Sequence, residues 1–152
     1  MGAFSPLTGF LNEEDYLSVV SRMRLSDGTV WSIPITLAVD EQQAASLKGG
    51  EKVALIGEED GVTYGPLEVQ SVYTVDQWEE ARRVFKTDDP EHPGVKKLLG
   101  RPATYVGGPI QVLNRPKPVQ FEQFYFDPAE TRRIFLLHQM WQHGIKQNLP
   151  AR

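Results

Sequence analysis

The stretch EKVALIGEEDGVTYGPLEVQSVY, residues 51–73, decides the fold class because it contains two strand-like runs joined by a tight turn. Residues 51–57 form a short apolar run, and residues 62–73 form a second strand-like run. The acidic segment Glu58-Glu59-Asp60-Gly61 between them is typical of a hairpin turn. Gly65-Pro66 predicts a bulge in the second strand. The stretch therefore predicts a β-hairpin.

Outward from this hairpin, helix and strand signals follow one another without the regular strand–helix alternation of a doubly wound fold. Asn12, Asp40, Asp76 and Asp127 suit the N-cap position of a helix. Predicted helices span residues 12–24, 41–47, a segment from Trp78 to Phe85, 93–99 and 128–143. Predicted further strands span residues 29–39, 102–115 and 119–126. Pro34 places the first at a sheet edge or in a bulge, and Gly107-Gly108-Pro109 is expected to break the second. Five or six strands with peripheral helices predict an α+β fold with a mixed or antiparallel, barrel-like sheet.

Composition excludes several classes of protein. The chain has 152 residues, net charge −4 and no cysteine, so disulfide scaffolds, thiolate metal sites and cysteine nucleophiles are ruled out. Lysine and arginine never form a run longer than two residues, which disfavours a nucleic-acid binder. No apolar run approaches the roughly 20 residues that span a bilayer. The cytoplasm is the compartment that we expect.

Few side chains suggest chemistry. The densest polar cluster is the loop Asp88-Asp89-Pro90-Glu91-His92, which could bind a cation or pair with a basic neighbour. An acidic helix N-terminus is the alternative interpretation of the same loop. His138 and His143 are five residues apart, so they do not share a helix face as a zinc-binding pair does. Phosphate-loop and serine-elbow motifs are absent from the sequence, and these residues alone therefore predict an α+β domain with no visible active site.

Several segments, in order along the chain, resemble one family. They are GAFSPLTGFLN at residues 2–12, MRLSDGTVW followed by IPITL within residues 23–37, DDPEHPGV at residues 88–95, YVGGPI followed by Asn-Arg within residues 105–115, and DPAETR at residues 127–132. Each match alone is weak, but five matches at sensible spacing over residues 2–141 are specific. The chain is identified as similar to the N-terminal region of the sulfate adenylyltransferases (ATP sulfurylases).

The resemblance implies a fold and a set of partners. It implies a single PUA-like β-barrel domain with peripheral helices over residues 1–144, followed by a loose tail over residues 145–152. In the full-length family enzyme, ATP and sulfate give adenosine 5′-phosphosulfate and pyrophosphate with magnesium, whereas no cofactor is expected in this chain. Expected partners are a nucleotidyltransferase catalytic domain or further copies of the chain. The expected contact residues are Asp89, Glu91, His92, Gly107 and Gly108.

The sequence departs from the family where catalysis is expected. The family's catalytic residues follow in a Gln-Thr-Arg-Asn-Pro segment and a His-x-x-His pair, which residues 147–150 echo only faintly. No catalytic residue is therefore assigned, and the chain alone is expected to be inactive and to act in assembly or as a scaffold. In the family, some tens of residues usually precede the segment that residues 2–12 resemble. Where those residues are missing, we expect exposed apolar surface that favours association. The alternatives are an RNA-binding PUA-like module and an enzyme with a relocated site near Asp89, Glu91 and His92.

Overall fold

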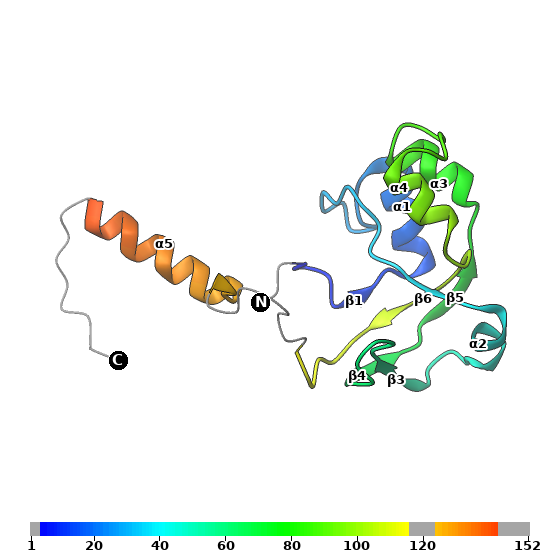
Figure 1. The fold of residues 1–152 in the computed structure, drawn as a ribbon, viewed down its shortest axis with the longest axis horizontal. Coiled ribbons are helices and arrows are strands. Elements are labelled where there is room, and N and C mark those ends of the chain that lie inside the picture. The colour runs from blue at the N-terminus through cyan, green and yellow to red at the C-terminus, as the bar shows by residue number, and fades with distance from the viewer. Residues whose placement is uncertain (1–3, 116–123, 143–152) are drawn as a thin grey trace. The chain divides into compact units, whose positions relative to one another are not determined.

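The computed structural model describes residues 4–115 and 124–142, and of residues 139–142 it describes the backbone alone. The chain divides into two compact units, which are Leu7–Arg115, and Met1–Pro6 together with Pro116–Arg152 (Figure 1). The predicted domain boundary at residue 144 and the predicted tail over residues 145–152 lie outside the described residues.

Strand β6, Thr104–Pro109, organises the larger unit because it pairs with three other strands, all antiparallel. It pairs with β5, Ser71–Thr74, along one edge, where Tyr73 lies opposite Tyr105. It also pairs with β2, Leu37–Val39, and with β1, Gly9–Phe10. The described strands thus form a four-stranded sheet centred on β6.

The hairpin predicted from residues 51–73 is confirmed. It is formed by β3, Lys52–Ile56, and β4, Thr63–Glu68, which pair antiparallel. The register shifts between Leu55 and Ile56, so the expected bulge near Gly65-Pro66 is present. The second predicted strand is wrong in one respect, because its segment forms two strands, β4 and β5, with a break at residues 69–70.

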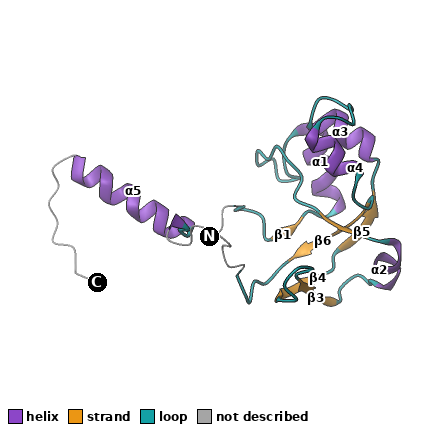
Figure 2. Ribbon diagram, viewed as in Figure 1, coloured by secondary structure: helices purple, strands orange, loops and turns teal. Residues whose placement is uncertain are grey.

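The helices begin where their caps predict. The Asn12 side chain accepts a hydrogen bond from the Asp15 N–H at 2.8 Å at the start of α1, Glu13–Arg22. Asp40, predicted as an N-cap, forms a capping box with Gln43 on α2, Glu41–Ser46. Asp76 caps α3, Gln77–Val84, and α4 spans Pro93–Leu99. Figure 2 shows α1, α3 and α4 gathered at one end of the unit, with α2 apart from them.

Two predictions for the strands are wrong. Residues 29–36 form no strand beyond a single bridge between Arg24 and Val30, and β2 begins only at Leu37. Trp31, Ile33 and Ile35 are the apolar residues that alternate there, and they do not share one buried face, because Ile33 is 57% exposed. Gly107 and Gly108 also do not break their strand, since both lie inside β6.

The core of this unit has three clusters of buried side chains. The first contains the rings of Tyr16, Tyr73 and Tyr105 with Leu11 and Val19. The second joins the two sheets through Leu67, Val69 and Val106, and the third packs α3 against α4 through Ala81, Val95 and Leu98. Antiparallel sheets with peripheral helices confirm the α+β class, and among the described residues the strands do not close into a barrel.

The second unit contains helix α5, Pro128–Gln142, as the sequence predicted. At its start, the Asp127 N–H donates to the Glu130 carboxylate at 3.0 Å. Three successive side chains of α5, Ile134, Phe135 and Leu136, are exposed. Most of the strand predicted at residues 119–126 lies outside the described residues, and its last residues, 124–126, are not in a strand.

Candidate functional site

A buried carboxylate lies where α1, α3 and β6 meet. Glu80 on α3 is only 4% exposed, because it faces inward beside Ala81 on the same helix. Its Oε2 accepts hydrogen bonds from the hydroxyls of Tyr16 and Tyr105, both at 2.9 Å. Two phenolic donors on one oxygen compensate much of the cost of removing a charge from water.

Arg101 completes this cluster. Its Nη2 donates to Glu80 Oε1 at 3.2 Å and to the Tyr105 hydroxyl at 2.8 Å. The guanidinium also lies over the Tyr105 ring, 4.9 Å from the centroid, which is a cation–π distance. Arg101 follows the C-cap of α4, so the end of that helix places it beside β6. We call Tyr16, Glu80, Arg101 and Tyr105 the Glu80 cluster.

The tyrosines of this region hold their protons strongly. Burial raises the pKa of Tyr16 far above its usual value, and the negative charge of Glu80 raises it further. Burial, and then the negative charge of Glu80, raises the pKa of Tyr105 to about 12, while Arg101 opposes the shift. Burial also raises the pKa of Tyr73, whose hydroxyl donates to the Leu11 carbonyl at 2.9 Å. All three phenols therefore remain neutral hydrogen-bond donors near neutral pH.

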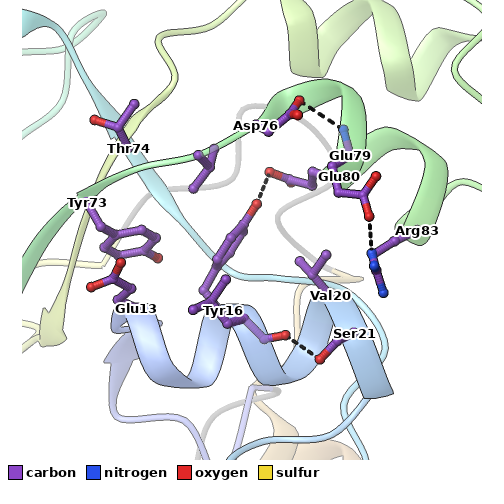
Figure 3. A pocket seen from close by; sticks show the side chains of 12 residues that line it. Glu13, Tyr16, Val20, Ser21, Tyr73, Thr74, Asp76, Glu79, Glu80 and Arg83 are labelled. Carbon is purple, nitrogen blue, oxygen red and sulfur yellow. Dashed lines mark hydrogen bonds and ion pairs between the residues drawn. The ribbon is translucent and has the colours of Figure 1, made fainter.

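A cavity of about 380 Å³ opens beside the Glu80 cluster, between α1, β5 and α3 (Figure 3). Its walls include Tyr16, Tyr73 and apolar side chains of α1. Its charged lining consists of four carboxylates and one arginine. The carboxylates are Glu13, Asp76, Glu79 and Glu80, and the arginine is Arg83. Glu79 is already paired with Arg82 and Arg83, and these hydrogen bonds lower its pKa. The excess of negative charge makes this cavity unsuited to sulfate or phosphate.

The structure brings Asp89, Glu91 and His92 together in the loop between α3 and α4. The Asp89 carboxylate accepts from the Glu91 N–H at 2.9 Å, which closes a tight turn. His92 Nδ1 accepts from the Gly94 and Val95 N–H groups at 3.2 and 3.4 Å and thereby caps α4. Its ring packs on Phe85 with centroids 5.4 Å apart. Two of the three side chains therefore shape the loop.

The same three residues line neither of two cavities in this unit, and they form no metal site with the other described residues. Asp89, Glu91 and His92 do not line the cavity beside the Glu80 cluster. They also do not line a second cavity, which lies between the two sheets. Within the described residues, no three His, Asp or Glu side chains are placed to hold a metal ion. This geometry gives the relocated-enzyme hypothesis no support.

Gly107 and Gly108 are buried in β6, so they are not at the surface of this unit. A Cβ at Gly107 would overlap the Leu11 carbonyl, and a Cβ at Gly108 would overlap the Glu68 carbonyl. Gly108 also has a φ of 154°. Close approach of β6 to its neighbours therefore accounts for both glycines, and their role in contacts with a partner stays a prediction.

Sequence reasoning missed the Glu80 cluster. Its residues are separated along the chain by as many as 64 positions between Tyr16 and Glu80. Only Arg101 and Tyr105 of this cluster are close in the sequence, four residues apart. Nothing in the local sequence distinguishes the buried Glu80 from the partly exposed Glu79 that precedes it.

Comparison with known proteins shows the family of domains to which this chain belongs. A family model described as a PUA-like domain matches residues 1–115, and the chain belongs to that family. This range contains β1 to β6 and α1 to α4. Within the part of the chain that the structure describes, no helix is long and apolar enough to cross a membrane.

The particular relatives are sulfate adenylyltransferases, which confirms the resemblance. The chain is 43% identical over 136 residues to the sulfate adenylyltransferase of Pelodictyon phaeoclathratiforme, which covers 89% of this chain and 34% of that protein. It is 48% identical over 131 residues to that of Halothermothrix orenii, covering 86% of this chain and 34% of that protein. The chain thus spans about a third of the length of these relatives, which fits an N-terminal PUA-like domain without the catalytic part.

A solved structure has a similar fold. The hexameric APS kinase from Thiobacillus denitrificans matches with a TM-score of 0.64 and 26% sequence identity, over 90% of this chain and 22% of that chain. The similarity to sulfate adenylyltransferases does not favour the RNA-binding alternative.

Proposed function

We propose that this chain is the N-terminal PUA-like module of a sulfate adenylyltransferase and supports catalysis by a partner domain. The observation that carries the proposal is similarity to these enzymes over 89% of the chain but over only 34% of their length. In the proposed assembly, ATP, sulfate and magnesium are bound by a nucleotidyltransferase domain. The reaction would then yield adenosine 5′-phosphosulfate and pyrophosphate.

The electrostatics of this chain agree with a non-catalytic role. Catalysis on sulfate and ATP needs positive charge and hydrogen-bond donors at the transferring phosphoryl group. The cavity beside the Glu80 cluster presents carboxylates, among them Glu13 and Asp76. This site would repel both anionic substrates, so we assign substrate binding to the partner domain.

Helix α5 supplies the apolar surface that such a partner would cover. Ile134, Phe135 and Leu136 are 46%, 64% and 59% exposed. Successive helical positions are about 100° apart, so three in a row cover more than half of the helix circumference. A helix exposed in this way gains stability by packing against another protein surface. We therefore propose α5 as a contact with the catalytic domain.

The loop between α3 and α4 is the second proposed contact. His92 is a poor position for testing it, because removal of the imidazole would uncap α4. Glu91 is the better choice, since its side chain is exposed and takes no part in the helix cap. We expect Glu91→Ala to weaken the association, and Glu59→Ala in the exposed β3–β4 turn is the matched control.

The test is a sulfurylase assay in which pyrophosphate release from ATP is measured with and without sulfate and magnesium. The chain is assayed alone and mixed with the remaining two thirds of the Halothermothrix orenii enzyme. We expect activity only in the mixture, and we expect Phe135→Ser to reduce it. Activity of the chain alone would refute the non-catalytic role, and a mixture with neither complex nor activity would refute the proposal of partnership.

Two further aspects of the proposal concern assembly and location. Self-association is proposed as well, with the hexameric structural relative as its support, and sedimentation velocity measures it directly. The proposed location is the cytoplasm, because the chain has no cysteine and the proposed reaction consumes ATP.

A further inference from the structure

A second cavity, of about 710 Å³, lies between the two sheets. It is lined by every residue of β2 and by Val53 to Ile56 of β3, with α2 at its rim. Successive residues of a strand point to opposite faces of a sheet. A cavity that touches successive residues of both strands therefore runs along their edges and not over one face. We call it the β2–β3 seam.

Both strand edges at the seam are free of strand partners within residues 4–115. β2 pairs with β6 on its other side, and β3 pairs only with β4. The two sheets are joined elsewhere, through a bridge between Leu67 and Ile110. Joined by this bridge, the two sheets form one series of neighbouring strands in the order β2, β6, β4 and β3. The series is open between β2 and β3.

Ala54 turns its backbone polar groups toward the seam. It lies opposite Pro66, whose carbonyl accepts from the Gln111 N–H at 3.0 Å on the far side of β4. Residues of an antiparallel pair alternate between hydrogen-bonded and non-hydrogen-bonded positions. Ala54 and Pro66 are thus a non-hydrogen-bonded pair, and the N–H and C=O of Ala54 face away from β4.

The same reasoning applies to Ala38 on the other edge. It lies opposite Tyr105 of β6. The Ala103 carbonyl accepts from the Val75 N–H at 2.9 Å on the β5 side, so Tyr105, two residues further on, also bonds on that side. The N–H and C=O of Ala38 therefore point away from β6. Two small residues, Ala38 and Ala54, present unpaired strand edges to one cavity.

The lining of the seam indicates what fits there. Its floor is apolar, with Leu67 and Val106 fully buried, while Ile56 at its margin is 63% exposed. Its charged residues are Asp40 and Glu58, both acidic, with no basic residue among those that line it. An occupant must supply backbone donors and acceptors, apolar side chains on one face and positive charge at an end.

We propose that the β2–β3 seam binds an extended segment of polypeptide from outside residues 1–152, which adds a strand to β2, to β3 or to both. The segment carries apolar side chains at alternate positions, facing Leu67 and Val106, and a basic side chain near Glu58. Such strand addition covers exposed edges that otherwise promote aggregation. The binding mode does not depend on the proposed catalytic partnership.

The probe is a peptide of about nine residues in which valine and threonine alternate between two terminal lysines, a length typical of strands. The full chain is labelled with ¹⁵N, and the exchange of its backbone amides is followed by NMR with and without the peptide. We expect exchange at Ala38, Ala54 or both to slow by about tenfold or more, because the added strand accepts from these N–H groups. Amides in the centre of β6 are the internal reference.

Three controls separate strand addition from apolar adsorption. A peptide with alternate amides N-methylated keeps its side chains but loses its edge donors, and it should not protect either amide. Ala54→Pro removes the edge N–H without removing a bond to β4, and Ala54→Val is its matched control. Glu58→Gln should weaken binding at low salt, because it removes a carboxylate from the rim.

The outcomes distinguish the occupants. Protection at Ala38 or Ala54 that is lost with the methylated peptide supports the proposal, and a strand added to β3 should also bind more weakly to Ala54→Pro than to Ala54→Val. Equal binding of both peptides means that the seam is only an apolar groove, and it would overturn strand addition. Protection without peptide that rises with protein concentration would identify a second copy of the chain as the occupant and would also overturn the proposal. No effect at Ala38 or Ala54 would do the same.

Discussion

Removal of the Glu80 carboxylate is the sharpest test of how this fold is held together. Glu80→Ala deletes the acceptor of three hydrogen bonds, from Tyr16, Tyr105 and Arg101. The two tyrosine hydroxyls then lie in the core without that acceptor, since Tyr16 is 3% exposed and Tyr105 is fully buried. Only the Tyr105 hydroxyl keeps a second partner, at 2.8 Å from Arg101.

The expected magnitude follows from these contacts. A hydrogen bond to a charged group contributes about 1.5–3 kcal/mol, and a buried donor without a partner costs about 1–3 kcal/mol. The Arg101 side chain is 34% exposed, so solvent reduces the contribution of its ion pair. We therefore expect Glu80→Ala to lower the free energy of unfolding by about 3–4 kcal/mol. Tyr16→Phe removes one of the three bonds and should cost about 1.5 kcal/mol.

The assay is equilibrium unfolding in urea, followed by circular dichroism and by tyrosine and tryptophan fluorescence. For an m-value of about 1.5 kcal/mol per molar urea, the midpoint should fall by about 2–2.7 M. Glu79→Gln is the matched control, because the neighbouring carboxylate is 42% exposed and pairs only with surface arginines. The urea midpoint of Glu79→Gln should remain nearly the same as that of the unmodified chain.

The reasoning is refuted if Glu80→Ala and Glu79→Gln shift the midpoint equally. The same holds if Tyr16→Phe costs as much as Glu80→Ala, since the carboxylate would then not be the common acceptor. Should Glu80→Ala fail to fold at all, the milder Tyr16→Phe still measures one bond of the cluster.

Two further predictions concern the same core. Gly107→Ala should destabilise the chain by about 2 kcal/mol or more, because its Cβ would overlap the Leu11 carbonyl, whereas Gly49→Ala, with open space around it, should have little effect in the same urea titration. Above pH ~10, unfolded tyrosines lose protons that the buried ones keep, so stability should fall by about 1.4 kcal/mol per pH unit for each buried tyrosine. For Tyr105 this loss should stop near its folded pKa of about 12. Unfolding midpoints at several alkaline pH values measure it, and a flat profile would contradict the assignment of buried phenols.

Local signals in the sequence predicted the helices well. Asn12, Asp40 and Asp76 each accept hydrogen bonds from the N–H groups of the helix that follows, as their positions predicted. A helix cap involves only residues within three or four positions of one another, so the local sequence is enough to predict it. The hairpin of β3 and β4 was predictable for the same reason.

The strands outside the hairpin were harder to predict. From Trp31 to Ile35 every second residue is apolar, yet Ile33 is exposed and the strand β2 begins only at Leu37. Alternation predicts a strand only where a sheet offers a partner edge, and the sequence does not say which edge is near. Gly107 and Gly108 are the converse case, since the tight packing inside β6 requires the glycines that otherwise suggest a break.

By itself, the sequence determined the helix starts, the hairpin, the α+β class and the relationship to sulfate adenylyltransferases, since short motifs carry all of these. Only the tertiary structure decided that Glu80 is buried while the Glu79 side chain stays 42% exposed, and that β2 and β3 leave a seam between them. The physical reason is that burial of a charge and pairing of a strand edge depend on partners far away along the chain. Tyr16 reaches Glu80 across 64 positions, and no local pattern records such a contact.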